Sequence, residues 1–411
     1  MKAKRWMLRP VLAAAASAAM FLSGCGGGGS SGDATGMGAL PGEAAVDASS
    51  GKSIVATGIS VLADFLNLDP SRPIDYETAL PEYFKAAAAA SDNTPANAPT
   101  SSEAITLGRV LFYDTSLSAN NTISCASCHQ QDIGFADDKR FSLGFSGTDA
   151  TTAHAMRLAN LRFYKPGSMF WNKRAASLEA QASKPLQHPV EMGFDPTHGG
   201  LEALLDKMRT LPYYPELFRL AFGDATITED RMQAALAQFM RRIVSVNSRW
   251  DSGYAKVYDP ALPDKGLNLD VPGLTIEENR GRHLFMAPRA QGGLACAACH
   301  VPPTFALAGS GSNGLDAGET TSFKSPSLKN VDRSSAFMHD GRFSSLEQVV
   351  EHSNSGVKDG KALDRRLKGP DGTPLVLNLA PEDKAALAAF LRTLSDPVLA
   401  ANPVFTNPFR K

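Results

Sequence analysis

Cysteine is scarce in this chain, which has five among its 411 residues, and four of the five belong to two short motifs. No pair is left over for a structural disulfide, so packing and any bound group must hold the fold together. The net charge is only −1, which gives no sign of a nucleic-acid partner or of a strongly basic docking face. The apolar run at residues 11–22 is shorter than the roughly 20 residues that a membrane-spanning helix needs.

Regular alternation of apolar and polar residues is also missing, so we expect no substantial sheet. Helical spacing is present instead. Apolar residues recur at intervals of three and four over residues 236–244 and again over 387–394. The second stripe follows Pro381 and two acidic residues, which is a typical helix start. The expected fold class is mostly α, with these stripes facing a core.

Two pentapeptides carry the pattern Cys-x-x-Cys-His, at residues 125–129 and 296–300. This spacing is the covalent attachment site of c-type haem. The two thiols form thioether bonds with the vinyl groups, and the histidine becomes an axial ligand of the iron. Two zinc half-sites or a disulfide pair are the alternative, which the repeated histidine disfavours. We therefore expect two covalently bound haem c groups. The predicted attachment residues are Cys125, Cys128, Cys296 and Cys299, and the predicted iron ligands are His129 and His300.

The fifth cysteine, Cys25, closes the segment Leu-Ser-Gly-Cys after a basic start and an apolar run. This pattern is typical of a secretory signal peptide, and Leu-Ser-Gly-Cys resembles a bacterial lipobox, in which the cysteine is lipidated. An ordinary signal peptide with an incidental cysteine is the alternative. Gly26 follows rather than an aspartate, so we expect a periplasm-facing lipoprotein, anchored in the outer membrane rather than the inner one. Export agrees with the haem motifs, because c-type haem is attached outside the cytoplasm.

The order of these features predicts two cytochrome c-like haem domains in tandem. Leu-Gly-Arg-Val-Leu-Phe at 107–112 precedes the first motif and Arg-Gly-Arg-His-Leu-Phe at 280–285 precedes the second, which indicates an internal duplication. A stretch rich in Pro, Asp and Gly between them is typical of a linker. The predicted division is a signal peptide at 1–24, a tether and extension at 25–100, the first haem domain at 101–255, a linker at 256–274, the second haem domain at 275–396 and a tail at 397–411.

Further blocks surround the haem motifs. They read Phe-Trp-Asn-Lys-Arg-Ala-Ala-Ser-Leu-Glu-Ala-Gln at 170–181, His-Pro-Val-Glu-Met-Gly at 188–193, Phe-Lys-Ser-Pro-Ser-Leu-Lys-Asn-Val at 323–331 and Phe-Met-His-Asp-Gly-Arg at 337–342. In the order and spacing of these blocks the chain resembles the bacterial di-haem cytochrome c peroxidase family, which includes the MauG-type enzymes. The resemblance runs from about residue 107 to 394.

The resemblance implies different tasks for the two haems. His129 would hold the peroxidatic haem and His300 the electron-transfer haem. Glu191 would move a proton during cleavage of the O–O bond, Gln181 would orient the peroxide or the carboxylate, and Trp171 would assist electron transfer between the haems. One carboxylate can act first as a base and then as an acid if its pKa is suitable, and the apolar neighbours of Glu191 should raise that pKa.

The sequence departs from the family at the second haem. The distal ligand there is usually a methionine or a tyrosine, but the position falls on Ser353, and a neutral serine is a poor iron ligand. A five-coordinate haem, a water ligand and an inward turn of His352 are the open alternatives. Some relatives carry a distal histidine at the first haem, but the matching loop at 144–148 has none. We expect an open face there, with His154 as a distal ligand the alternative.

The expected activity is reduction of hydrogen peroxide to water with electrons from a small cytochrome c or cupredoxin. A MauG-type enzyme that oxidises residues of a partner protein and a di-haem electron carrier without peroxide chemistry are the alternatives, and Glu191 and Gln181 disfavour the carrier. The resemblance also implies a calcium ion (Ca²⁺) between the domains, although Ser334 and Ala336 stand where threonine and proline are usual. Family members are often homodimers, but no residue pattern here marks an interface.

Overall fold

A computed structural model of the chain describes residues 60–69, 71–307 and 311–411. All of them belong to one compact unit, which runs from Gly51 to Lys411. The predicted signal peptide and Cys25 lie outside the described residues. Within the described ranges, no helix has both the length and the apolar character needed to cross a membrane.

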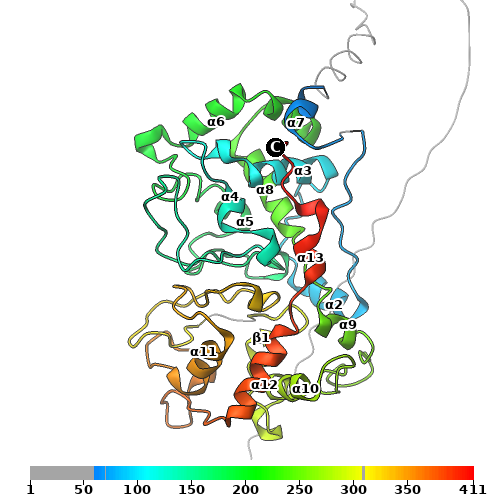
Figure 1. Cartoon of the computed structure of the whole chain (residues 1–411), viewed down its shortest axis with the longest axis vertical. Coiled ribbons are helices and arrows are strands. Elements are labelled where there is room, and N and C mark those ends of the chain that lie inside the picture. The colour runs from blue at the N-terminus through cyan, green and yellow to red at the C-terminus, as the bar shows by residue number, and fades with distance from the viewer. Residues whose placement is uncertain (1–59, 70, 308–310) are drawn as a thin grey trace, which may run out of the picture. The chain divides into compact units, whose positions relative to one another are not determined.

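Helices dominate the fold (Figure 1). The paired strands in the described part of the chain are two residues long, β1 (His300–Val301) and antiparallel β2 (Ala306–Leu307). The mostly α fold class is thereby confirmed. The α-helices are α2 (Glu82–Ser91), α3 (Ser102–Tyr113), α4 (Cys125–Cys128), α5 (Leu178–Ala182), α6 (Gly200–Thr210), α7 (Tyr213–Phe222), α8 (Glu229–Arg241), α9 (Arg249–Tyr254), α10 (Ile276–Met286), α11 (Leu346–Glu351), α12 (Pro381–Arg392) and α13 (Pro397–Ala401).

Both predicted apolar stripes are buried on helices. The α8 helix follows Thr228, whose hydroxyl accepts the N–H of Arg231 and so caps the first turn. Its stripe is buried, but the helix ends at Arg241, so Ile243 and Val244 are buried beyond its end. The α12 helix begins at Pro381, as the sequence predicts.

Two helix pairs, α3 with α8 and α10 with α12, repeat the same close contact. A Cβ atom added at Gly108 of α3 would lie 2.0 Å from the carbonyl oxygen of Ala235. A Cβ atom added at Gly281 of α10 would lie 1.8 Å from the carbonyl oxygen of Ala386. Only glycine allows two helix backbones to approach this closely. The two contacts confirm the internal duplication that the sequence indicates.

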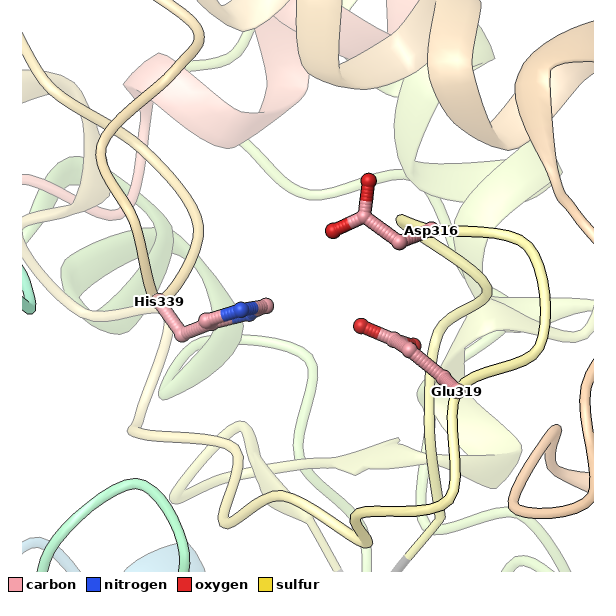
Figure 2. Close-up of side chains that lie close together, drawn as sticks. All are labelled: Asp316, Glu319 and His339. Atoms are coloured by element: carbon pink, nitrogen blue, oxygen red, sulfur yellow. The ribbon is translucent and has the colours of Figure 1, made fainter.

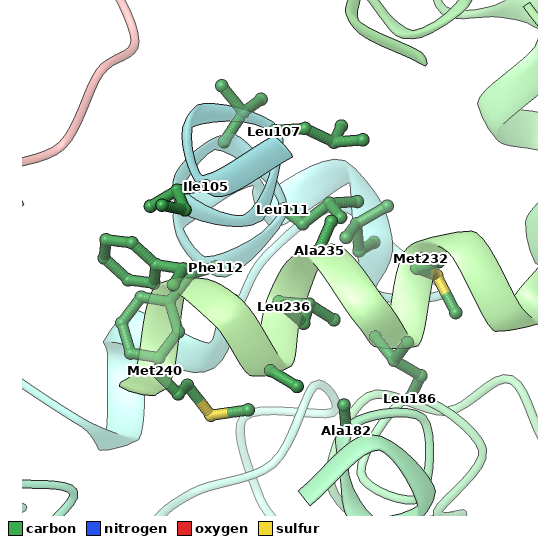
Figure 3. Close-up of a cluster of buried hydrophobic side chains, with 14 of the residues drawn as sticks. Ile105, Leu107, Leu111, Phe112, Ala182, Leu186, Met232, Ala235, Leu236 and Met240 are labelled. Atoms are coloured by element: carbon green, nitrogen blue, oxygen red, sulfur yellow. The ribbon is translucent and has the colours of Figure 1, made fainter. Parts of the chain in front are cut away.

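Two hydrophobic cores are built around these pairs. The first includes Leu111 of α3 and Leu236 of α8 (Figure 3). The second surrounds Trp250 and joins α9, α10 and α12. The cores do not follow the predicted boundaries, because Tyr83 of the extension packs into the second core and Phe405 of the tail packs into the first.

Candidate haem centres and peroxide site

Each Cys-x-x-Cys-His motif lies on a short turn beside one core. The first is on α4, which Ser124 and Ser127 cap reciprocally, and the second is on a 3-10 turn over Cys296–Ala298. The four cysteines are free and partly exposed. Burial raises the pKa of Cys125 and of Cys296 to about 12, so both thiols are neutral. Each motif therefore has two free thiols, as thioether attachment requires.

The two motif histidines are also neutral. Burial lowers the pKa of His129 and of His300 to about 4. The Nδ1–H group of His129 donates to the carbonyl oxygen of Phe135 at 3.4 Å, which leaves Nε2 as the nitrogen with a free lone pair. In His300, Nδ1 is buried without a hydrogen-bond partner in the described part of the chain. Metal ligation needs a neutral imidazole, and a hydrogen bond from the second nitrogen fixes its orientation.

A cavity of about 320 Å³ opens beside Cys128. Its wall combines Asp137, Lys139 and Ser142 with the loop at 143–147. Free thiols, a neutral histidine and this adjoining space fit a haem c at the first motif. The second motif repeats the thiols and the histidine.

Glu191 lies next to the loop that lines this cavity. The N–H of Phe145 donates to the Glu191 carbonyl oxygen at 2.9 Å. The Glu191 side chain is 30% exposed, and burial raises its pKa, while His188 and Arg174 oppose the rise. Burial also raises the pKa of Cys128, and the Asp137 and Glu191 charges add to the rise. The raised pKa that the sequence predicts for Glu191 is confirmed.

His188 holds the backbone of this segment. Its Nδ1 atom accepts the N–H groups of Val190 and Glu191, each at 3.2 Å. The same atom lies 3.8 Å from Oε1 of Glu191. From sequence we expect His188 to be structural, and these hydrogen bonds agree with that expectation.

Gln181 lies near the end of α5, whose first turn is capped by the Ser177 hydroxyl. Among the residues that the structure describes, the Gln181 side chain makes no hydrogen bond and is therefore not joined to Glu191. Its role in orienting peroxide stays a prediction.

Trp171 lies where the two predicted haem domains meet. Its Nε1–H group donates to the carbonyl oxygen of His154 at 2.7 Å, and its own carbonyl oxygen accepts the N–H of Lys324 at 2.8 Å. Its ring centroid is 6.4 Å from that of His339, and His339 stacks on Phe323 at 4.1 Å. Trp171 thus contacts residues of both predicted domains, and its part in electron transfer stays a prediction.

His154 joins the same junction. Its Nδ1–H group donates to the Lys139 carbonyl oxygen at 2.9 Å, and its Nε2 atom is 3.5 Å from the Ser334 hydroxyl. His154 as a ligand of the first haem iron stays an untested alternative.

The junction does not fit the calcium ion that the resemblance implies. The Ser334 hydroxyl lies within hydrogen-bond distance of the carbonyl oxygens of Asp137 and Ala336, at 2.9 and 3.0 Å. The two carbonyl oxygens face the Ser334 hydroxyl as their donor, and the His154 imidazole stands beside them, whereas Ca²⁺ takes six to eight oxygen ligands.

The segment expected to reach the second haem is distorted. The α11 helix ends at Glu351, and residues His352–Gly356 form a π-helical turn. His352 is buried and its Nε2–H group donates to the carbonyl oxygen of Asn313 at 3.1 Å. Ser353 is exposed, with its hydroxyl on the Val349 carbonyl. A π turn changes which residues face inward, and such turns are frequent at functional sites. The inward residue here is His352.

Two Cys-x-x-Cys-His turns on duplicated helix pairs, each with a neutral histidine, define a c-type di-haem protein. The sequence matches the family described as di-haem cytochrome c peroxidase over residues 102–258 and 277–368. The methylamine utilization protein MauG of Methylorubrum extorquens is 30% identical over 72% of this chain and 79% of that protein. Cytochrome c551 peroxidase of Nitrosomonas europaea is 29% identical over 62% of this chain and 73% of its own length.

Comparison with solved structures gives the same family. A MauG-like protein associated with microbial copper homeostasis has a TM-score of 0.64 and 28% identity, and the match covers 81% of this chain and 99% of that protein. The di-haem peroxidase BthA of Burkholderia thailandensis shares the fold, with a TM-score of 0.56 and 22% identity over 75% of this chain and 90% of its own. The chain belongs to the di-haem cytochrome c peroxidase family. It is an oxidoreductase that acts on peroxide, with two haem c groups and a redox partner.

Proposed function

We propose that the chain reduces hydrogen peroxide to water at the first motif, with electrons from a small cytochrome c or cupredoxin that enter at the second. Glu191 is the observation that carries this proposal. It is a partly buried carboxylate with a raised pKa, and it lies beside the cavity at the first motif.

Haem c bound at these motifs would supply a peroxide-binding iron held by His129 and an electron-passing centre held by His300. The Glu191 carboxylate takes the proton of the inner peroxide oxygen and returns it to the outer oxygen, which leaves as water. One group can do both because burial moves its pKa from that of an exposed glutamate toward the working pH. The Gln181 amide would orient the peroxide, and Trp171 would lie on the electron path.

We also propose His352 as the distal ligand of the second haem. The π turn buries its imidazole and leaves Ser353 in solvent. As a ligand, His352 would give up its hydrogen bond with Asn313. A histidine ligand lowers the haem reduction potential relative to methionine.

The test uses the haem-loaded chain without its lipid anchor, mixed with peroxide in a stopped-flow instrument. Replacing Glu191 with Gln should lower peroxide turnover by about 10²-fold or more, the usual size of a general acid–base contribution, with haem loading unchanged. Glu202→Gln on the exposed start of α6 is the matched control and should react like the wild type. Turnover that survives in Glu191→Gln would show that another group moves the proton.

A MauG-type reaction, in which residues of a partner protein are oxidised, is the second candidate. The position of Trp171 between the two domains favours it, as does the similarity to proteins named MauG. Reduced cytochrome c as a probe separates the two. Peroxidase activity consumes two reduced cytochromes per peroxide. A MauG-type enzyme would leave the probe largely unreacted, and its Trp171→Phe variant would no longer oxidise the partner protein.

For localisation, we propose a periplasm-facing protein lipidated at Cys25 and held in the outer membrane. The support is the Leu-Ser-Gly-Cys segment after an apolar run. Cys25→Ser should release the protein from the membrane fraction, and retention of that variant in the membrane would disprove the anchor.

A further inference from the structure

Two carboxylates and one imidazole converge at the edge of the predicted second haem domain, outside the peroxide site. They belong to Asp316, Glu319 and His339, and one nitrogen or oxygen atom of each lies within 4.8 Å of the others. Figure 2 shows the three side chains approaching a common space from two separate loops. The loops are joined to each other by the side chain of Arg342, which binds Asp316.

Asp316 is held in a fixed orientation by that arginine. The Nη1 atom of Arg342 donates to Oδ1 at 2.8 Å and Nη2 donates to Oδ2 at 2.7 Å. Arg342 also pairs with Asp340, through Nε at 2.7 Å. One guanidinium therefore serves two carboxylates, of which Asp340 has a second, more distant partner in Arg140 at 3.7 Å. Each Asp316 oxygen keeps a second lone pair that faces away from the guanidinium.

Glu319 carries a charge that no cation compensates. The Ser312 hydroxyl donates to Oε2 and so fixes the carboxylate. In the described ranges Glu319 forms no ion pair with any lysine, arginine or histidine, although its side chain is partly buried. A partly buried carboxylate of this kind usually has a positive partner. Oε1 remains available for one.

His339 is the third group, and its ring is clamped. It stacks on Phe323 at 4.1 Å with an interplanar angle of 15°, and the Trp171 ring meets it edge-on. Its backbone carbonyl oxygen accepts the N–H of His154 at 2.9 Å. No described residue forms a hydrogen bond with its ring nitrogens. Packing thus orients the imidazole and leaves a ring nitrogen free to bind a metal ion.

We propose that Asp316, Glu319 and His339 bind a first-row divalent transition-metal ion. One nitrogen and two oxygen donors suit ions such as Zn²⁺ or Mn²⁺. Each donor is already oriented by an outer partner, namely Arg342, Ser312 and Phe323, as ligands in metal sites are. Three protein ligands leave coordination positions for water, so the ion exchanges with solvent.

An ion bound at this site would lie near His352, the proposed distal ligand of the second haem. The Nε2–H group of His352 donates at 3.1 Å to the carbonyl oxygen of Asn313, which lies on the same loop as Asp316. A bound cation would be the largest local charge beside that residue. We therefore expect the ion to raise the reduction potential of the second haem.

The test uses the full haem-loaded chain, with calorimetric titration of Zn²⁺ and electron paramagnetic resonance of Mn²⁺. The wild type should bind one ion, and Glu319→Gln and His339→Gln should each weaken binding about tenfold or more. Asp340→Asn removes an equal charge beside the same arginine without removing a ligand, and should weaken binding far less. Haem content and the helical circular dichroism of each variant report on folding.

A second readout is the potential of the second haem, titrated with and without Zn²⁺. The ion should raise it in the wild type and leave it unchanged in Glu319→Gln. Absence of binding to the wild type, or equal binding by all three variants, would overturn the site. None of these outcomes depends on peroxide turnover, so the result stands apart from the proposed function.

Discussion

Substitutions of His188 test most directly how the backbone of Glu191 is held. The His188 Nδ1 atom accepts two backbone N–H groups, from the residues two and three positions later, and so fixes the backbone of Glu191. Asparagine can reproduce this pattern, because its side-chain oxygen stands where Nδ1 stands and commonly accepts backbone N–H groups two or three residues later. Alanine cannot. His188→Ala and His188→Asn therefore separate the hydrogen bonds from the imidazole itself.

The size of the effect follows from the two hydrogen bonds. Each contributes about 0.5–1.5 kcal/mol, and because the His188 side chain is 42% exposed, water can replace part of that. A net loss near 1.4 kcal/mol corresponds to about a tenfold fall in rate. We expect kcat/KM for peroxide to fall about tenfold in the alanine variant and to stay within about threefold of wild type in the asparagine variant.

The pH profile gives an independent readout. Glu191 must be ionised to accept a proton, so turnover is present above its pKa and is lost as the pH falls through it. Burial raises that pKa, and His188 opposes the rise. Both variants remove the imidazole, so both should move the acid limb of log(kcat/KM) to higher pH. A His188→Ala enzyme with wild-type rates at every pH, or an asparagine variant as slow as alanine, would refute the reasoning.

Three further predictions follow from other contacts. Arg174→Gln removes the second positive influence on Glu191 and should also shift the acid limb to higher pH, as measured by the same assay. His352→Ala should turn a six-coordinate, low-spin spectrum of the second haem into a high-spin one, whereas Ser353→Ala should leave it unchanged; the reverse pattern would make serine the ligand. Gly281→Ala should lower the free energy of unfolding by about 1–3 kcal/mol in urea titration, because the added Cβ atom meets the Ala386 carbonyl; no change would mean that the helix pair can separate without cost.

Some of this molecule could be predicted from local sequence. The two pentapeptides identify the haem sites because thioether chemistry requires that spacing and a following histidine. The helix that begins at Pro381 was predicted because proline and acidic residues favour a helix start. The duplicated glycines at 108 and 281 were visible as a repeat, although the close helix contact that requires them was not.

Other features depend on contacts between distant residues. The π turn at His352–Gly356 has no sequence signal of its own, so the burial of His352 and the exposure of Ser353 could not be predicted. The core boundaries could not be drawn from composition, because Tyr83 bonds to the buried carboxylate of Asp251, some 170 residues further along. A contact between residues so far apart in the chain depends on three-dimensional packing, and no local sequence pattern indicates it.

Direct hydrogen bonds hold the junction at Trp171, where the two predicted domains meet. Its indole donates to the His154 carbonyl, its carbonyl accepts from Lys324, and the His154 N–H donates to the His339 carbonyl. The Lys324 side chain is buried against Met169, with a pKa that burial lowers to about 7. These direct hydrogen bonds join Trp171 to residues of both predicted domains. An electron path through Trp171, as proposed above, would be held in place by them.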